Sequence, residues 1–318
     1  MEEPREQVTG RGCNKTECWI LAAIGLLVIG MRAQAQNRGV YPLGMSATNS
    51  GVTPLPGFTY VNQLIFYSRD HVKDNSGNTL PVIGANYVLM DMNSLAWVSK
   101  KKLFGGASFS AVATLPFAKN DLTSDIQGKI SGGAGFADSY YLPFILGWNR
   151  ERVAIRTMYG FLAPTGRFAA DGSDNVGAGY WTHTLSSGQT FYLTGNKRLV
   201  FSAFQMYEFH TIQEDTAIHP GETFDLDYSL MRSTSVHGNV QMQIGVAGYE
   251  QRQTTAKTGP MISPAASDDR YSINSLGFAT NAAFPKRKTS LGLKYFKEFL
   301  DRSTFQGYSF QFSGSLNF

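Results

Sequence analysis

The 318-residue sequence predicts an all-β fold, an up-and-down antiparallel transmembrane β-barrel of about 12 strands. Three observations predict it. From Phe58 onward, runs of alternating polar and apolar residues are separated by turn-forming clusters; short and long connections alternate between these runs; and an apolar segment near the start has the pattern of an export signal. The composition agrees, because 22 Phe, 15 Tyr and 33 Gly accompany only 16% charged residues.

Residues 1–35 are expected to be a cleaved secretory signal peptide. The apolar stretch 19–30 is too short to cross a bilayer as a helix, and a small-x-small cleavage site that ends at Ala35 follows it. Residues 1–18 carry four acidic and three basic residues, whereas a signal peptide begins with a positive charge. A translation start at Val8 would restore that charge. The alternative interpretation is an amphipathic or buried N-terminal helix.

Both cysteines, Cys13 and Cys18, precede the apolar stretch, so cleavage after Ala35 leaves a mature chain without cysteine. The sequence therefore predicts no disulfide, no thiolate metal site and no lipid anchor, and we expect no cofactor and no metal. The removed segment carries as many basic as acidic residues, so the net charge of the mature chain remains +4. This excess is too small to predict nucleic-acid binding.

Twelve runs have the period-2 character of β-strands, and together they define a barrel over residues 58–318. The expected strands are 58–72, 82–98, 103–117, 136–149, 152–163, 178–194, 199–213, 222–235, 239–253, 270–284, 289–300 and 305–318. A β-sandwich with one solvated face would explain the alternation equally well. A closed barrel is favoured because it pairs every backbone N–H and C=O group, as hydrocarbon requires.

The connections are of two kinds, which favours the barrel. Short, polar and mostly basic turns are expected at 99–102, 149–151, 195–198, 236–238 and 285–288. The connections between them are mainly longer loops, expected at 73–81, 118–135, 164–177, 214–221 and 255–269, with a short one at 301–304. Outer-membrane barrels place short turns on the periplasmic side, so the bacterial outer membrane is the expected location. The basic residues at 100–102 and 286–288 keep turns soluble or face anionic lipid headgroups.

The last expected strand shows the two faces most clearly. Its apolar face carries Tyr308, Phe310, Phe312, Gly314, Leu316 and Phe318, and its polar face carries Ser309, Gln311, Ser313, Ser315 and Asn317. Such a strand is expected to contact outer-membrane lipids. Phe318 is expected to end it and to be recognised by the barrel-assembly machinery.

The same alternation predicts which polar side chains face the lumen. The candidates for the solute path are Arg156, Glu208, His210, Asp225, Asp227, Gln241, Gln243, Tyr249, Gln251, Lys294 and Glu298, together with Gln311. Charges of both signs favour paired networks over a filter of one sign, and the alternative is solvated wall residues or structural ion pairs. A twelve-stranded barrel is wider than side chains can fill. Residues 36–57, rich in Gly, Pro, Ser, Thr and Asn, are expected to enter the lumen as a plug or gate, or to remain a periplasmic tail.

Several motifs resemble those of the meta-pathway phenol-degradation outer-membrane family. They are Gly135-Phe136-Ala137-Asp138 with Pro143, Leu146 and Trp148; Ala163-Pro164-Thr165-Gly166-Arg167 with Asn175, Gly177 and Trp181; and Tyr207-Glu208-Phe209, Asp215-Thr216, Pro220-Gly221, Asp227-Tyr228, Gly248-Tyr249, Gln251, Lys294-Tyr295, Glu298-Phe299 and Gly307. The resemblance covers roughly residues 54–318. It implies a transporter-like barrel for the uptake of small hydrophobic or aromatic compounds, and it implies no particular site residue.

Two other classes of function remain as alternatives. A twelve-stranded phospholipase barrel carries a Ser two residues after a His, and none of the five histidines has one. Ser202 could still act as a nucleophile with His210 as its general base. No catalytic motif is present, however, so we expect no enzyme and no catalytic residue. A structural or surface-anchoring barrel would carry long, repetitive or charged loops, whereas the longest loops expected here are moderate.

Overall fold

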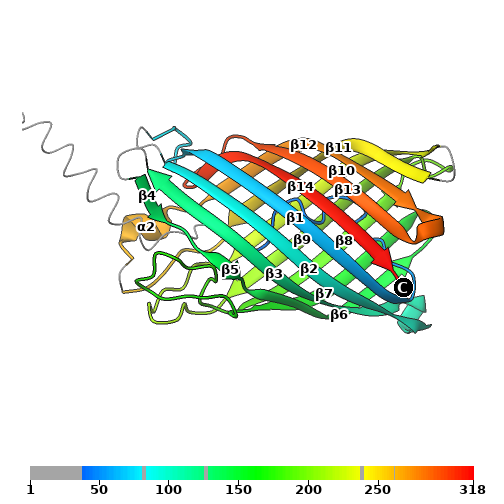
Figure 1. Cartoon of the computed structure of the whole chain (residues 1–318), viewed down its shortest axis with the longest axis horizontal. Helices are drawn as coiled ribbons and strands as arrows, with labels where there is room; N and C mark the ends of the chain where they lie inside the picture. The colour runs from blue at the N-terminus through cyan, green and yellow to red at the C-terminus, as the bar shows by residue number, and fades with distance from the viewer. Residues whose placement is uncertain (1–37, 81–83, 125–127, 237–239, 261) are drawn as a thin grey trace, which may run out of the picture. The chain divides into compact units, whose positions relative to one another are not determined.

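The structure, a computed structural model, describes residues 38–80, 84–124, 128–236, 240–260 and 262–318 (Figure 1). The chain divides into two units, Met1–Ala35 and Gln36–Phe318, and the described residues all belong to the second. The expected signal peptide therefore lies outside the described residues, as does most of the expected turn 236–238. Among the described residues, no helix has the length and apolar character to cross a membrane.

Twelve long antiparallel strands form a closed ring in the second unit. They are β1 (Gly57–Val72), β2 (Gly84–Lys102), β3 (Ser108–Ser124), β6 (Ser139–Asn149), β7 (Val153–Ala163), β8 (Thr182–Tyr192), β9 (Leu199–His210), β10 (Thr223–Val236), β11 (Val240–Gln253), β12 (Ser272–Phe284), β13 (Thr289–Glu298) and β14 (Phe305–Asn317). Each pairs with the next long strand along the chain, and β1 pairs with β14 to close the ring. The prediction of a twelve-stranded up-and-down barrel is confirmed.

Two strands are longer than the sequence predicted. The structure continues β2 to Lys102 and β3 to Ser124, where the sequence predicted ends at 98 and 117. Two short strands, β4 (Gly128–Ser131) and β5 (Ala134–Phe136), also pair with β3, so the loop predicted at 118–135 is wrong. The polar residues 118–124 suggested a loop, yet strand residues beyond the hydrocarbon layer can be polar on both faces. The turn predicted at 99–102 belongs to β2, and the chain turns at η2 (Phe104–Gly106).

The two faces of the wall have opposite character. On β14, Phe310 and Phe312 are 37% and 53% exposed on the outer face, whereas Ser309 and Gln311 are almost fully buried on the inner face. Similar apolar side chains cover the outer face of other strands, among them Leu185, Ile244, Phe278 and Leu291. An apolar exterior around a polar interior is the pattern of a barrel that stands in lipid.

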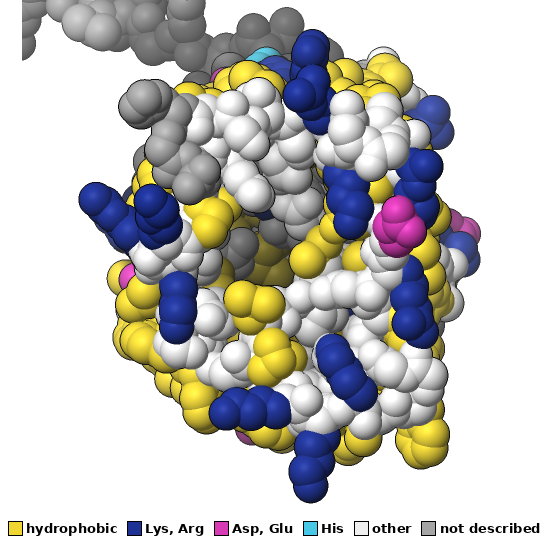
Figure 2. Space-filling model, turned by 90° about the vertical axis from the view of Figure 1, so that its right-hand side faces the viewer, with side chains coloured by type: hydrophobic (Ala, Val, Ile, Leu, Met, Phe, Trp, Pro, Cys, Tyr) yellow, Lys and Arg dark blue, Asp and Glu magenta, His cyan; other side chains and the backbone are white. Residues whose placement is uncertain are grey.

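The two ends of the barrel differ in their connections and in charge. Among the described residues, one end, called the turn end, carries the turns at 103–107, 150–152, 193–198 and η4 (Pro285–Arg287). The opposite end, called the loop end, carries longer connections, including 164–181, 211–222 and the connection 254–271 with α2 (Pro264–Asp268). Figure 2 shows Lys and Arg side chains around the rim of the turn end. The exposed cations of this end are Lys100, Lys101 and Lys102 of β2 and, in the turns, Arg150, Arg152, Lys197, Arg198, Lys286, Arg287 and Lys288, with Glu151 as the acidic residue of these turns.

Residues 38–56 are called the inner segment, and their part from Arg38 to Thr53 lies inside the ring. Arg38 bonds to Thr304 at the loop end, and the backbone N–H of Thr53 donates to Asn149 at the turn end, so the segment follows the length of the lumen. Tyr41 and Leu43 are buried in one apolar cluster with wall side chains that include Phe204. The segment therefore occupies space that the strands enclose but their own side chains do not fill.

Candidate functional site

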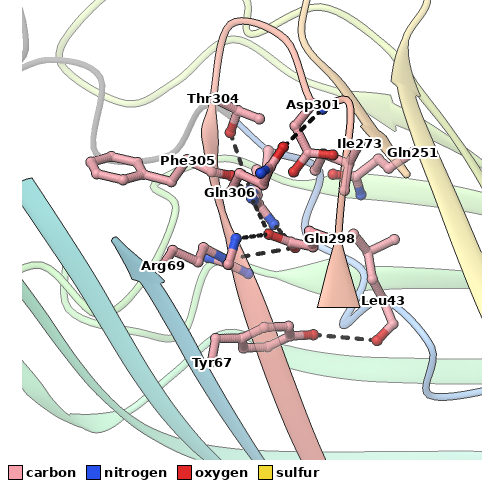
Figure 3. Close-up of polar contacts among 12 residues, drawn as sticks. Leu43, Tyr67, Arg69, Gln251, Ile273, Glu298, Asp301, Thr304, Phe305 and Gln306 are labelled. Atoms are coloured by element: carbon pink, nitrogen blue, oxygen red, sulfur yellow. Dashed lines mark hydrogen bonds and ion pairs between the residues drawn. The ribbon is translucent and has the colours of Figure 1, made fainter. Parts of the chain in front are cut away.

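The lumen begins at the loop end with a buried ion pair between the inner segment and the wall (Figure 3). Arg38 donates from Nη1 to Oε1 of Glu298 at 2.7 Å and from Nη2 to Oε2 at 3.1 Å. Arg69 of β1 lies on the same carboxylate, with Nε 3.9 Å from Oε1, and Tyr249 donates its hydroxyl to it at 3.1 Å. The single carboxylate of Glu298 thus lies between the positive charges of Arg38 and Arg69. A paired, two-pronged bond of this kind is among the stronger polar contacts in proteins.

A second wall carboxylate holds the backbone of the inner segment. Glu208 of β9 accepts the N–H of Val40 at 2.9 Å and that of Tyr41 at 2.7 Å. His210 lies 3.3 Å from the same carboxylate through Nε2. A Cβ at Gly39 would lie 2.6 Å from Oε2 of Glu208, so a larger residue there would displace the carboxylate.

A third carboxylate binds the next turn of the segment. Asp227 of β10 accepts the hydroxyl of Tyr41 at 2.6 Å and the N–H groups of Gly44 at 2.9 Å and Ser46 at 3.0 Å. Lys294 of β13 donates to the carbonyl oxygens of Gly44 at 2.8 Å and Met45 at 2.6 Å. An anion and a cation of the wall therefore bind N–H and C=O groups of the same short stretch.

Mainly neutral groups hold the segment toward the turn end. The N–H of Asn49 donates to the hydroxyl of Ser202 at 3.1 Å, and its side chain donates to Gln243 at 2.8 Å. The N–H of Gly51 donates to Thr190 at 3.0 Å. Among the residues that the structure describes, the one charged partner in this part is Arg156, whose Nε donates to the carbonyl of Ser50 at 2.8 Å.

Most lumen candidates from the sequence lie against the inner segment. Direct hydrogen bonds to it come from Arg156, Glu208, Asp227, Gln243, Gln251, Lys294, Glu298 and Gln311. Three further candidates contact these wall residues. His210 lies against Glu208, Tyr249 donates to Glu298, and Asp225 accepts from Gln251 at 2.7 Å. Gln241 is exposed near the start of β11. A role of these side chains in a solute path stays a prediction.

Several residues of the lumen escaped the sequence analysis. Arg69 follows Ile65 and Tyr67 on one face of β1, and period 2 could have identified it. Arg38 and Tyr41 stand in a segment without periodicity, so no sequence signal marked their contacts. Ser202, Thr190 and Asn149 are small polar residues of the kind that fills most polar strand faces.

The catalytic pairing considered from the sequence is wrong. Ser202 and His210 stand eight residues apart on β9, which corresponds to about 26 Å along a strand. Ser202 instead bonds to Thr190 at 3.1 Å, and His210 bonds to Thr182 at 2.8 Å. Among the described residues, no group of three or more His, Cys, Asp or Glu side chains is placed to hold a metal ion.

Comparison with solved structures shows the same architecture. An outer-membrane channel from Pseudomonas putida F1 has a TM-score of 0.68 and 14% identity, covering 88% of this chain and 100% of that chain. The β domain of the Bordetella autotransporter BrkA has a TM-score of 0.51 and 13% identity, covering 83% of this chain and 100% of that chain. At such identities the likeness is one of fold. No curated protein matches the sequence.

The match to a protein family is more specific than the match of fold. Residues 69–314 match the family described as the MetA pathway of phenol degradation. The match spans nearly the whole ring, from Arg69 to Gly314, and includes the wall residues that hold the inner segment. The chain therefore belongs to the MetA-pathway phenol-degradation family, as its motifs suggested.

Proposed function

We propose that this protein is a channel of the bacterial outer membrane for small hydrophobic or aromatic compounds, and that the inner segment is a plug that partly closes its lumen. The short turns then face the periplasm and the longer connections face the outside. The lumen residues serve binding and permeation, and no catalytic role is assigned to them.

One observation carries the proposal: the space inside the ring is held by a segment that belongs to no strand. Each long strand of the wall pairs with a neighbouring strand on both of its sides, so the ring does not need the inner segment to complete the hydrogen bonds of its own backbone. The segment is bound by side chains, chiefly through its own N–H and C=O groups. Its displacement would open a path without breaking any strand pairing.

The wall beneath the segment also favours apolar solutes. Phe204 and Met206 of β9, Met231 of β10 and Phe296 of β13 are buried on the inner face, where Tyr41 stacks on Phe204 with ring centroids 5.3 Å apart. Displacement of Tyr41 would uncover an aromatic surface inside an otherwise polar lumen. Aromatic rings stack on such surfaces with a gain of about 0.5–1.5 kcal/mol beyond area burial.

Single-channel recording in planar bilayers tests the plug. A variant that lacks residues 38–56 should insert, fold and conduct more current than the wild type, because the lumen loses its occupant. Equal and negligible currents from both proteins, with folded barrels in each, would identify a closed structural barrel and overturn the proposal. Release of fatty acid from micellar phospholipid would point to a hydrolase instead.

The solute class is tested on the same bilayers. We expect benzoate to interrupt the current of the plug-deleted channel more often than acetate, because both are carboxylates and only benzoate carries a ring. Phe204→Ala should reduce this difference, whereas Phe201→Ala, on the outer face of the same strand, should preserve it. Interruption by both anions to the same extent would remove the preference for aromatic compounds.

A further inference from the structure

A groove lies on the outer face of the wall near the turn end, across β1, β14 and β13. Its volume is about 400 Å³, within the roughly 300–1,000 Å³ typical of ligand pockets. The lining residues are Tyr60, Asn62, Phe284, Arg287, Thr289, Ser290, Leu291, Gly314, Ser315 and Leu316. The groove is separate from the lumen, because Tyr60, Leu291 and Leu316 are exposed on the apolar face.

A missing side chain creates the groove. Gly314 stands between Asn62 of β1 and Leu291 of β13 in the strand register, at a position where its neighbours along β14 are Phe312 and Leu316. A Cβ built on Gly314 meets only a methyl group of Leu291, at 3.7 Å, so the position has room for a larger residue. A hydrocarbon chain that lies over Gly314 would cover apolar surface that the side chains of β14 leave exposed.

A cation stands at one border of this apolar surface. Arg287 lines the groove and belongs to η4, the turn between β12 and β13, with Lys286 and Lys288 on either side. All three are exposed, and among the described residues none of them has an ion-pair partner. An arginine matches a phosphate oxygen pair in geometry as well as in charge.

We propose that this groove binds one anionic phospholipid of the surrounding membrane, with an acyl chain over Gly314 and the headgroup phosphate on Arg287. The inference rests on the proposed membrane location. A phospholipid fits because the apolar surface around Gly314 is followed, along the strand direction, by the cation Arg287, just as the acyl chain of a phospholipid is followed by its headgroup. Basic residues at the rim of a membrane protein attract anionic lipid, each by about 1 kcal/mol.

Native mass spectrometry of the full-length protein, released from detergent micelles, measures lipid binding directly. We expect the wild type to retain one phosphatidylglycerol in preference to phosphatidylethanolamine. Arg287→Gln should weaken phosphatidylglycerol binding about tenfold, because a hydrogen bond to a charged group is lost. Arg198→Gln removes a cation from another turn of the same rim and should leave binding unchanged.

The groove itself is tested by Gly314→Leu, which fills the space without a backbone clash. It should abolish retention of the lipid while Arg287 remains in place. Loss of lipid to the same extent in Arg287→Gln and Arg198→Gln, or full retention in Gly314→Leu, would overturn the site. Channel currents of all three variants should equal those of the wild type, since none of these residues faces the lumen. In the wild type, currents without lipid retention would contradict this site alone, and lipid retention without currents would contradict the channel alone.

Discussion

The two halves of the inner segment are held by different chemistry. Residues 38–46, the loop-side half, bond to the carboxylates of Glu298, Glu208 and Asp227 and to the ammonium group of Lys294. Residues 47–56, the turn-side half, bond mostly to hydroxyl and amide groups of the wall. Both halves lie in the same lumen and follow the same strands.

This difference indicates which half of the segment is released more easily. A hydrogen bond to a charged group contributes about 1.5–3 kcal/mol, whereas one between neutral groups contributes about 0.5–1.5 kcal/mol. The loop-side half is therefore the fixed part of the segment, and the turn-side half is the part that leaves the wall first. Under the proposed orientation, the lumen opens from the periplasmic side.

The largest effect is expected from Glu298→Gln, which attacks the fixed half. The change leaves the buried guanidinium groups of Arg38 and Arg69 without their shared anion, and loss of one partner of a buried pair costs about 3–5 kcal/mol. Hydrogen exchange at the amides of Val40 and Tyr41 should accelerate accordingly. Mass spectrometry of peptides from residues 38–46 measures this exchange.

Glu250→Gln is the matched control for this change. Glu250 pairs with Arg252 at 3.3 Å on β11, and both side chains are more than a third exposed, so its loss should cost no more than about 1 kcal/mol. Arg38→Gln combined with Glu298→Gln should recover part of the exchange protection, because one buried guanidinium group, that of Arg69, then lacks its anion instead of two. Unchanged exchange in the single variant Glu298→Gln would show that charge does not fix this half.

The ring was predictable from the sequence because its causes are local. A strand in lipid must alternate its faces, and Tyr308–Phe318 and Val240–Gln253 show that alternation residue by residue. Prediction failed at the ends of β2 and β3, where the chain leaves the hydrocarbon layer and both faces meet water. There the pairing of Tyr87 with Asp121 is dictated by the neighbouring strand and not by alternation.

For the contacts inside the lumen, only the wall side chain of each contact could be predicted from the sequence. Inward residues such as Glu208 and Lys294 follow from strand period, so their position against the lumen could be inferred. Their partners are backbone groups of Val40, Gly44 and neighbouring residues, and a backbone group carries no sequence signal. The contact of Arg38 with Glu298 spans 260 residues, and a single sequence gives no means of pairing them.

A smaller effect is expected from Gly51→Ala, which attacks the turn-side half. A Cβ at Gly51 would lie 2.0 Å from the carbonyl oxygen of Ala154, so the segment must move off β7. Overpacking of this kind costs about 1–3 kcal/mol. Current through the channel should rise while exchange at Val40 and Tyr41 stays slow. Gly195→Ala, at an open position of the rim, should change neither. Faster exchange in both halves would mean that the segment moves as one body.

A last effect is a pH dependence confined to the loop end. Burial, reinforced by the nearby charge of Glu298, raises the pKa of Asp301 to about 7. The folded protein thus holds this proton more tightly than the unfolded chain, whose aspartates titrate near 3.9. The resulting stabilisation is complete below about pH 4 and is lost as the pH rises through about 7.

Asp301 accepts the N–H of Asn274 at 2.9 Å, so exchange at that amide reports on the loop between β13 and β14. After correction for intrinsic rates, its protection should fall from pH 5 to pH 8, while that of Gly51 should stay constant because the amide of Gly51 donates to a neutral hydroxyl, that of Thr190. Asp301→Asn should remove the dependence at Asn274. If the dependence persisted in that variant, or appeared equally at Gly51, the titrating group would lie elsewhere and the chemical contrast between the two halves would not extend to pH.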